Sequence, residues 1–183
     1  MLIKTIFSGF GGQGVLSMGY TLATAAMLEG KHVTYFPSYG VEVRGGTANC
    51  TVAVSDEEIA SPVASEPEFV VAMNQPSFVR FQSLLQSGGL IFVNSSIVDA
   101  SSTRGDIEVV AVPTSELAEK LGTIKVANMV MLGAFIRLST IISFDFMIKN
   151  LSQILGEGKS KLIKMNKDAL ELGFNYIKLT INK

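Results

Sequence analysis

Short apolar runs alternate with helical or turn-rich stretches through the first two thirds of the chain. Residues 2–7 (LIKTIF) form a β-branched run that stops at glycine, which is typical of a strand buried on both faces of a sheet. Residues 15–28 are apolar nearly all round and close at Glu29-Gly30, which predicts a helix ended by a C-terminal glycine. The same reasoning predicts strands at 32–36, 47–54, 69–73, 90–93 and 107–112, and helices or turns at 76–85 and 113–121.

This β-α-β order predicts an α/β layered domain with a largely parallel sheet and right-handed crossovers. From residue 126 the strand signals stop, and three helices are expected at 126–139, 144–155 and 159–172. The charge changes with the pattern, because residues 149–183 hold seven Lys and three acidic residues whereas residues 1–148 hold eight basic and thirteen acidic ones. With no linker, repeat or low-complexity tract, we interpret residues 1–183 as one domain with a helical C-terminal part.

Composition excludes several classes of function. Fifteen Lys and Arg against sixteen Asp and Glu give a formal net charge of −1, so no overall positive field attracts a nucleic-acid backbone. A single cysteine cannot supply an intrachain disulfide, a thiolate zinc site or an iron–sulfur cluster. The mean hydropathy of +0.38 favours an apolar surface that another subunit covers.

Residues 5–28 contain no charged side chain over 24 positions, which is long enough to span a bilayer. The stretch nevertheless carries five glycines, Gln13 and several Ser and Thr, and it lacks the features of a secretory signal. We therefore interpret it as a loop and a buried helix, and we expect a cytoplasmic protein that does not enter a membrane.

The glycine loop is the first candidate site. Residues 8–14 (SGFGGQG) match G-x-G-x-x-G with Gly9, Gly11 and Gly14, after a predicted strand and at the opening of a predicted helix. Glycine allows close approach of a ligand, and a helix N-terminus presents free N–H groups and partial positive charge. The loop therefore favours an anion such as phosphate, and the alternative is a turn that only lets the helix pack tightly on the strand.

A dinucleotide site also needs an acidic residue at the end of the second strand. Glu29 has the right spacing but falls at the end of the first helix, and Glu42 comes several residues too late. The sequence therefore disfavours NAD.

A second candidate site is the ten-residue segment 37–46 (PSYGVEVRGG), which leaves the second strand near the glycine loop. Arg44 is suited to clamping a phosphate or carboxylate, and Tyr39 to stacking on a ring. The alternative is a hairpin in which Glu42 and Arg44 pair with each other.

The remaining chemistry-bearing residues suggest structural roles. Cys50 alternates in phase with neighbouring apolar residues and is expected to be inert packing, and His32 is expected on the surface. With one His, a Ser-His-Asp set is impossible, and no paired carboxylates stand out. We expect no catalytic residue and no metal site in this chain. Methionines at helical positions are interpreted as core or interface filler: Met18, Met27, Met129 and Met131.

The glycine loop, followed by YGVEVRGGTANC and VSDEEIASP, resembles the gamma subunit of the 2-oxoacid:ferredoxin oxidoreductases, most closely the short form of the 2-oxoglutarate (2-ketoglutarate) enzymes. The likeness covers nearly the whole chain, through KMNKDALELGF. It implies a Rossmann-like, non-catalytic subunit that packs against alpha and beta, and in some complexes delta, chains. The companion chains would hold thiamine diphosphate, Mg²⁺ and iron–sulfur clusters, the complex would pass electrons to ferredoxin, and the product would be an acyl-CoA.

The resemblance further implies that this chain helps form the coenzyme A side of the active site. At matching positions, backbone N–H groups of the glycine loop would face an anion, and segment 37–46 would adjoin it. Val41 stands where many relatives have proline. The residues implied are Gly9, Gly11, Gly12, Gln13, Gly14, Tyr39, Glu42, Arg44, Gly45 and Gly46.

Two alternatives stay open. One is a free-standing nucleotide-binding or regulatory protein. The other is a gamma-type chain of an indolepyruvate, pyruvate or branched-chain 2-oxoacid oxidoreductase, because the choice of substrate rests on residues in other subunits.

Overall fold

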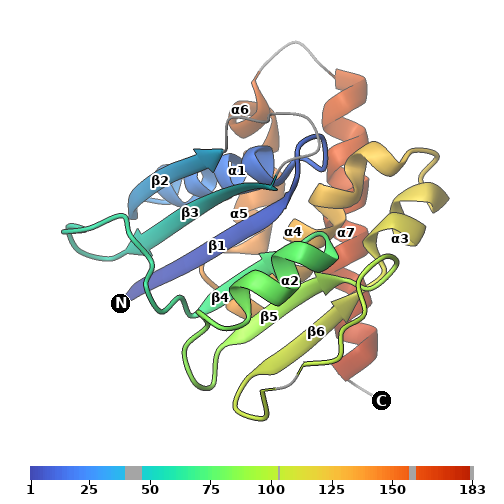
Figure 1. The fold of residues 1–183 in the computed structure, drawn as a ribbon. Helices are drawn as coiled ribbons and strands as arrows, with labels where there is room; N and C mark the ends of the chain where they lie inside the picture. Colours follow the sequence, from blue (N-terminus) through green and yellow to red (C-terminus); the bar gives the residue numbers. More distant parts are fainter. Residues whose placement is uncertain (40–46, 103, 157–159, 182–183) are drawn as a thin grey trace.

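A six-stranded mixed sheet forms the centre of the computed structural model, which describes residues 1–39, 47–102, 104–156 and 160–181. The strands are β1 (Leu2–Phe10), β2 (His32–Tyr39), β3 (Thr47–Ser55), β4 (Phe69–Ala72), β5 (Leu90–Asn94) and β6 (Glu108–Val112), in the order β2-β3-β1-β4-β5-β6 (Figure 1). The β1–β4, β4–β5 and β5–β6 pairs are parallel. The predicted α/β fold with a largely parallel sheet is confirmed, and β3 is the exception, antiparallel to both β1 and β2.

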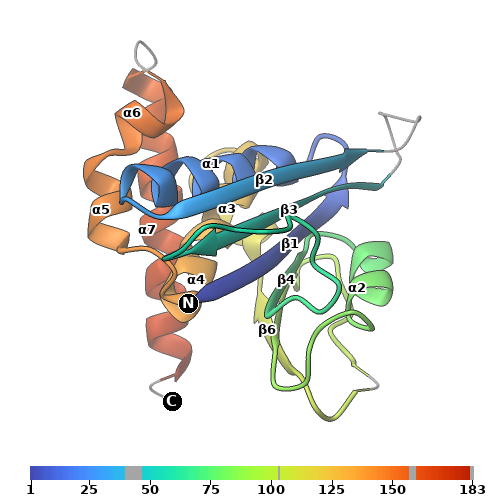
Figure 2. The ribbon, with the colours of Figure 1, turned by 90° about the vertical axis from the view of Figure 1, so that its left-hand side faces the viewer.

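The helices are distributed unequally over the two faces of this sheet (Figure 2). On one face, the helix formed by described residues is α2 (Gln75–Phe81), which packs on Ile6, Val70 and Ile91. The other face carries the larger core. Its helices are α1 (Val15–Leu28), α3 (Thr114–Lys120), α4 (Ala127–Ser139), α5 (Phe144–Lys149), α6 (Leu151–Leu155) and α7 (Ser160–Ile181), with the short 3-10 turn η1 (Ile124–Val126) leading into α4.

The larger core is organised around α4, which is buried along most of its length. Phe135 of this helix meets the rings of Phe7 and Phe92 edge-on, with centroids 5.5 and 5.3 Å apart. Strand residues alternate between the two faces, so Phe7, Val71 and Phe92 enter this core while their neighbours in sequence enter the smaller one under α2. Burial on both faces explains why these strands read as continuous apolar runs.

Most predicted elements are confirmed, and the differences concern where they end. β2 continues through Pro37 to Tyr39, so the predicted end of this strand at residue 36, directly before the proline, is wrong. Proline is tolerated there because β2 is an edge strand, whose outward N–H groups need no partner in the sheet. The helix expected at 144–155 divides into α5 and α6 at Asn150, and the last helix extends beyond residue 172 to Ile181.

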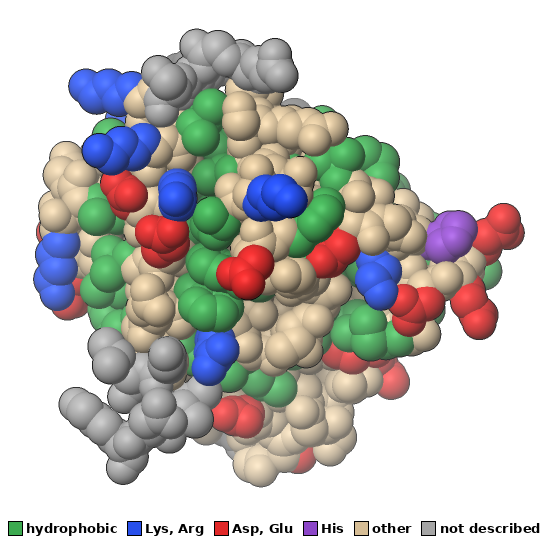
Figure 3. Space-filling model, turned by 180° about the vertical axis from the view of Figure 1, so that it is seen from behind, with side chains coloured by type: hydrophobic (Ala, Val, Ile, Leu, Met, Phe, Trp, Pro, Cys, Tyr) green, Lys and Arg blue, Asp and Glu red, His purple; other side chains and the backbone are tan. Residues whose placement is uncertain are grey.

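The face seen from behind carries hydrophobic side chains in a band, with basic and acidic side chains interspersed around it (Figure 3). Among the described residues visible on this face, basic and acidic side chains alternate and do not form a continuous basic patch. In the described part of the chain, no helix combines the length and hydropathy that a membrane crossing requires.

Candidate functional site

The glycine loop lies where the sheet opens between β1 and β4. β1 leads through α1 to the side of β3 and β2, whereas β4 leads through α2 to β5, and these two helices lie on opposite faces. The connections after β1 and β4 therefore diverge at the carboxyl edge of the sheet, which is the position where open α/β sheets bind ligands.

The loop begins later than the sequence indicates. Gly9 lies inside β1, paired with Ala48 of β3, and not in the loop. A Cβ at Gly9 would lie 2.7 Å from Gln13 Oε1 and 2.8 Å from Val15 Cγ1, so this glycine is required for packing. The sequence predicts that Gly9 offers an N–H group to an anion. The structure shows that Gly9 is also needed for close packing against Gln13 and Val15.

Gly12 is the tip of the loop, with φ of +100° and open space where a Cβ would stand. The N–H of Gln13 donates to Phe10 O at 3.1 Å and closes the turn, so this amide is already engaged. Gly14 caps α1 in the left-handed conformation, at φ 72°, and supplies no side-chain cap. Because the first turn of α1 contains no acidic residue, nothing within this helix offsets its N-terminal partial charge.

Two cavities flank this tip. The first, about 240 Å³, lies between the loop and residues at or after the ends of β4, β5 and β6. The second, about 210 Å³, lies on the β3 side of the loop. Gly12 lines both. The first is lined by Gly12, Gln13, Met73, Asn94, Ile97, Ser115, Ile124, Lys125 and Ala127, and the second by Phe10, Gly11, Gly12, Gly14, Val15, Leu16 and Ala48.

The first cavity combines polar groups with an apolar rim. Asn94 ends β5, and its amide donates to Ser115 Oγ at 2.9 Å at the start of α3. Lys125 contributes a cation from η1, while Ile97 and Ile124 are 55% and 56% exposed at the edge. A cavity of this kind accommodates a ligand that carries both an anionic group and an apolar part.

Of the second predicted segment, residues 37–46, the structure describes residues 37–39 and places them near the glycine loop. Tyr39 ends β2 opposite Ala48, which in turn pairs with Gly9, so its backbone is two strand spacings, about 10 Å, from Gly9. β2 and β3 are antiparallel neighbours, but residues 37–39 belong to β2 itself, so the connection between the two strands is shorter than the ten residues predicted. Glu42, Arg44, Gly45 and Gly46 lie outside the described residues.

Sequence reasoning missed Asn74 and Asn128, which both bond to the loop. Asn74 Nδ2 donates to Gln13 Oε1 at 3.3 Å, and Asn128 Nδ2 donates to Gly14 O at 3.2 Å. A signal existed for Asn128, because it is a single amide inside the apolar stretch VANMVML, where a polar side chain needs a partner.

Most of the residues for which the sequence suggested a structural role lie where that role requires. Burial raises the pKa of the Cys50 thiol to about 12, and the Cys50 side chain has no exposed surface. His32 is exposed, whereas Glu29 ends α1 and accepts the Ser143 N–H at 3.1 Å, far along the helix from the glycine loop. Three of the four methionines are buried, and Met27 is 59% exposed. Among the described residues, no group of three or more His, Cys, Asp or Glu side chains could hold a metal ion.

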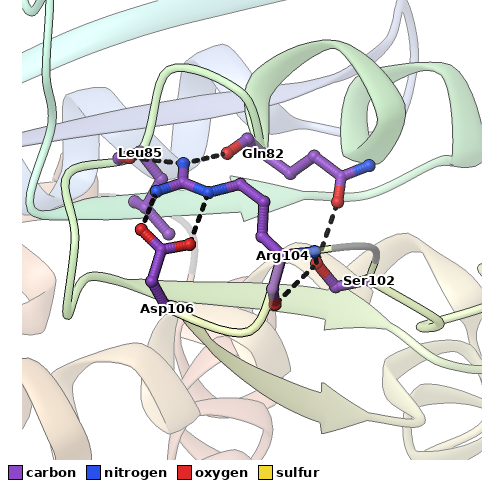
Figure 4. A network of polar contacts seen from close by, with 5 residues as sticks. All are labelled: Gln82, Leu85, Ser102, Arg104 and Asp106. Carbon is purple, nitrogen blue, oxygen red and sulfur yellow. Dashed lines mark hydrogen bonds and ion pairs between the residues drawn. The ribbon is translucent and has the colours of Figure 1, made fainter.

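A second polar cluster, at the amino edge of the sheet, has a structural explanation. The Arg104 guanidinium pairs with the Asp106 carboxylate and donates to the carbonyls of Gln82 and Leu85 at 2.8 and 2.6 Å (Figure 4). This pairing lowers the pKa of Asp106 and raises that of Arg104. Arg104 thus ties the strand connection before β6 to the end of α2, and its charge is already neutralised.

Residues 4–176 match the family model described as pyruvate ferredoxin/flavodoxin oxidoreductase. The chain is 40% identical over 179 residues to the ketoisovalerate oxidoreductase subunit VorA of Methanothermobacter thermautotrophicus, covering 98% of this chain and 37% of that protein. It is 34% identical over 154 residues to the 2-oxoglutarate synthase subunit KorC of Methanocaldococcus jannaschii, covering 82% of each. The chain thus spans little more than a third of the VorA relatives it matches.

Solved structures share the fold. The gamma subunit of a keto/oxoacid ferredoxin oxidoreductase from Geobacter sulfurreducens superposes with a TM-score of 0.82 at 27% identity, covering 97% of this chain and 99% of that one. A 2-oxoglutarate:ferredoxin oxidoreductase chain from Magnetococcus marinus gives a TM-score of 0.79 at 23% identity, and this chain covers 31% of it.

Proposed function

Because this chain belongs to the pyruvate ferredoxin/flavodoxin oxidoreductase family, we propose that it is the gamma subunit of a 2-oxoacid:ferredoxin oxidoreductase complex. Such a complex converts a 2-oxoacid to an acyl-CoA and is an enzyme only when assembled. Thiamine diphosphate, Mg²⁺ and iron–sulfur clusters would belong to the companion chains. The donor set here agrees with that division, since the one cysteine is buried and protonated.

Within this complex, we assign the glycine loop to the coenzyme A side of the active site. The observation that carries the assignment is the open tip at Gly12, which lies between two cavities at the uncapped N-terminus of α1. Coenzyme A is an extended molecule that carries a pyrophosphate and a 3′-phosphate in its nucleotide half, and backbone amides at a helix N-terminus suit a phosphate. Arg44 and the adjoining segment remain part of this proposal on sequence grounds.

The outer face of α1 supports a role as a subunit. Tyr20 and Met27 are 57% and 59% exposed on this helix, and Phe36 of the adjacent β2 is 50% exposed. No residue of α1 is charged, so its solvent-facing side lacks the lysines and carboxylates that normally keep an exposed helix in water. This surface fits the expectation, drawn from hydropathy, that a companion chain covers part of the molecule.

The identity of the 2-oxoacid substrate is a separate question from the role of the chain as a subunit. The resemblance in sequence pointed to 2-oxoglutarate, but the relatives are named for ketoisovalerate, 2-oxoglutarate, indolepyruvate and pyruvate. Identity is 40% and 37% to the two VorA proteins over at least 95% of this chain, against 33–36% to KorC proteins over 69–82%. These values favour a branched-chain 2-oxoacid, and 2-oxoglutarate is the second candidate.

The assignment of the loop is tested by steady-state kinetics of the assembled complex. We expect Gly12→Asp to raise the KM for coenzyme A at least tenfold, about the effect of losing one charge-assisted hydrogen bond, because a carboxylate at the tip repels a phosphate. Arg44→Ala should act in the same direction.

Gly30→Asp is the matched control, since Gly30 also has a positive φ, +90°, and open space at its Cβ position but precedes β2 at the opposite edge of the sheet. Unchanged coenzyme A affinity and turnover in both Gly12→Asp and Arg44→Ala would refute the assignment.

A further inference from the structure

The side chain of Gln13 is fixed to the protein and not directed to a ligand. Its Oε1 accepts from the Phe10 N–H at 2.7 Å and from Asn74 Nδ2 at 3.3 Å, while its Nε2 donates to Met73 O at 2.9 Å. Both ends of the amide are therefore engaged. These bonds join the loop after β1 to the residues that follow β4, 60 positions away in sequence.

Asn74 extends the connection into the interior. It is only 2% exposed, and its Oδ1 accepts the Ser77 N–H at 2.8 Å at the start of α2. Ser77 Oγ in turn accepts from Ser8 Oγ at 2.8 Å within β1. The brace on Gln13 is thus part of a buried network, which holds one geometry because each group depends on its neighbours.

Asn128 holds the loop from the other side. Its Nδ2 donates to the carbonyl of Gly14 at 3.2 Å, and the same carbonyl accepts the first helical hydrogen bond of α1, from Met18 N at 2.9 Å. The side chain stands so close that a Cβ on Gly14 would lie 2.5 Å from Nδ2. Asn128 is 7% exposed and begins α4, so the base of the loop is anchored to the most buried helix.

We propose that Gln13 and Asn128 are positioning residues for ligand binding. Their side chains fix the loop backbone at Gln13 and Gly14, between the two cavities, so that the Gly12 amide is held ready for the anion. This proposal rests on the proposed function of the loop. Neither side chain needs to touch the ligand. Their effect arises because a loop already held in its binding geometry loses less conformational freedom when the ligand arrives.

The experiment uses the assembled complex with Gln13→Met and, separately, Asn128→Leu, which preserve side-chain size while removing the hydrogen bonds. The measurements are the KM for coenzyme A, the KM for the 2-oxoacid, the rate of iron–sulfur reduction by the 2-oxoacid alone, and the thermal midpoint. We expect each variant to raise the KM for coenzyme A about five- to tenfold, because a loop that is no longer held in its binding geometry must be ordered when the ligand binds. The KM for the 2-oxoacid and the rate of iron–sulfur reduction should stay near those of the parent. The thermal midpoint should fall by a few degrees, because each variant leaves polar partners of the network without a hydrogen bond.

Gln75→Met is the matched control. Gln75 also bonds to main chain through both amide atoms, with the N–H and carbonyl of Asp99, but it lies in α2 and does not contact the loop. This variant should leave the KM for coenzyme A unchanged.

Three results would overturn the proposal. The first is a KM for coenzyme A within twofold of the parent in both variants while Gly12→Asp raises it, which would leave the proposed function intact. The second is a parallel loss of all activities and of thermal stability, which would mark a purely structural role. The third is no effect of Gly12→Asp either, which would remove the proposed function as well.

Discussion

Cys50 is packed between β3 and α1 at a point of very close approach. Its Sγ lies 3.7 Å from the Val15 carbonyl, and a Cβ at Gly19 would stand 2.4 Å from it. Alternation with Ala48 and Val52 predicted an inert, buried thiol from sequence, and the structure confirms that position. The raised pKa, about 12 against an ordinary value of 9.0, follows from burial, which disfavours the thiolate.

We expect Cys50 to be unreactive in the folded protein. At pH 8 a thiol with this pKa is ionised in about one molecule in 10,000, and the sulfur is also shielded from reagents. Titration with a thiol-specific chromogenic disulfide should give no signal from native protein and one equivalent in denaturant. Rapid labelling of the native chain would contradict this.

The same raised pKa makes stability depend on pH. Between pH 9 and 12 the thiol stays protonated in the folded protein but ionises in the unfolded chain. The stability that this thiol contributes below pH 9 is therefore lost as the pH rises toward 12.

At the same scale, the glycine loop was recognisable from sequence and its supports were not. The spacing of Gly9, Gly11 and Gly14 located the turn. The partners of Gln13 and Gly14 lie 60 and 114 positions away, however, and no local pattern encodes such a bond. The turn itself could therefore be predicted from the sequence, and the side chains that hold it in place could not.

Two glycines set the distance between α4 and α7. A Cβ at Gly133 would lie 2.0 Å from Leu170 O, and one at Gly173 would lie 1.8 Å from Val130 O. The two helices therefore meet backbone to backbone, which joins the C-terminal helix to the centre of the larger core. In α7, Met165, Ala169, Leu170 and Gly173 recur at helical spacing, which predicts that the helix docks by one face but does not identify the partner helix. Leu162, earlier in the same pattern, is 45% exposed.

We expect Gly173→Ala and Gly133→Ala each to lower the free energy of unfolding by about 3 kcal/mol or more, because the added methyl must push two helix backbones apart. Chemical denaturation followed by circular dichroism measures this. Gly105→Ala is the control, since its Cβ would meet no atom within 4 Å, and it should be near neutral. Equal stability in all three variants would show that α7 is not held at this distance.

At the scale of the whole molecule, the length of this chain can be compared with the lengths of its relatives. Relatives range from chains that this one matches nearly end to end to VorA proteins of which it covers 36–37%. The same fold therefore occurs alone and as part of a longer polypeptide. That observation agrees with a gamma unit whose site is completed by neighbouring chains or domains.

Purification from the native host should therefore yield this chain with companion subunits in a brown, iron-containing complex. Turnover of that complex with four 2-oxoacids should give the highest kcat/KM with ketoisovalerate, followed by 2-oxoglutarate, with pyruvate and indolepyruvate lower. Preference for 2-oxoglutarate would replace the substrate assignment and leave the subunit role standing. A colourless monomer that holds a nucleotide would instead support a free-standing binding protein.

The sequence by itself determined the α/β class, nearly all the strands and helices, and the glycine turn, because each depends on neighbours within a few residues. Only the tertiary structure decided that β3 inserts antiparallel between β1 and β2, that the loop faces two cavities, and that Gln13, Asn74 and Asn128 fix it. The reason is physical: sheet order and buried hydrogen bonds depend on which distant segments pack together, and local propensity carries no record of that choice.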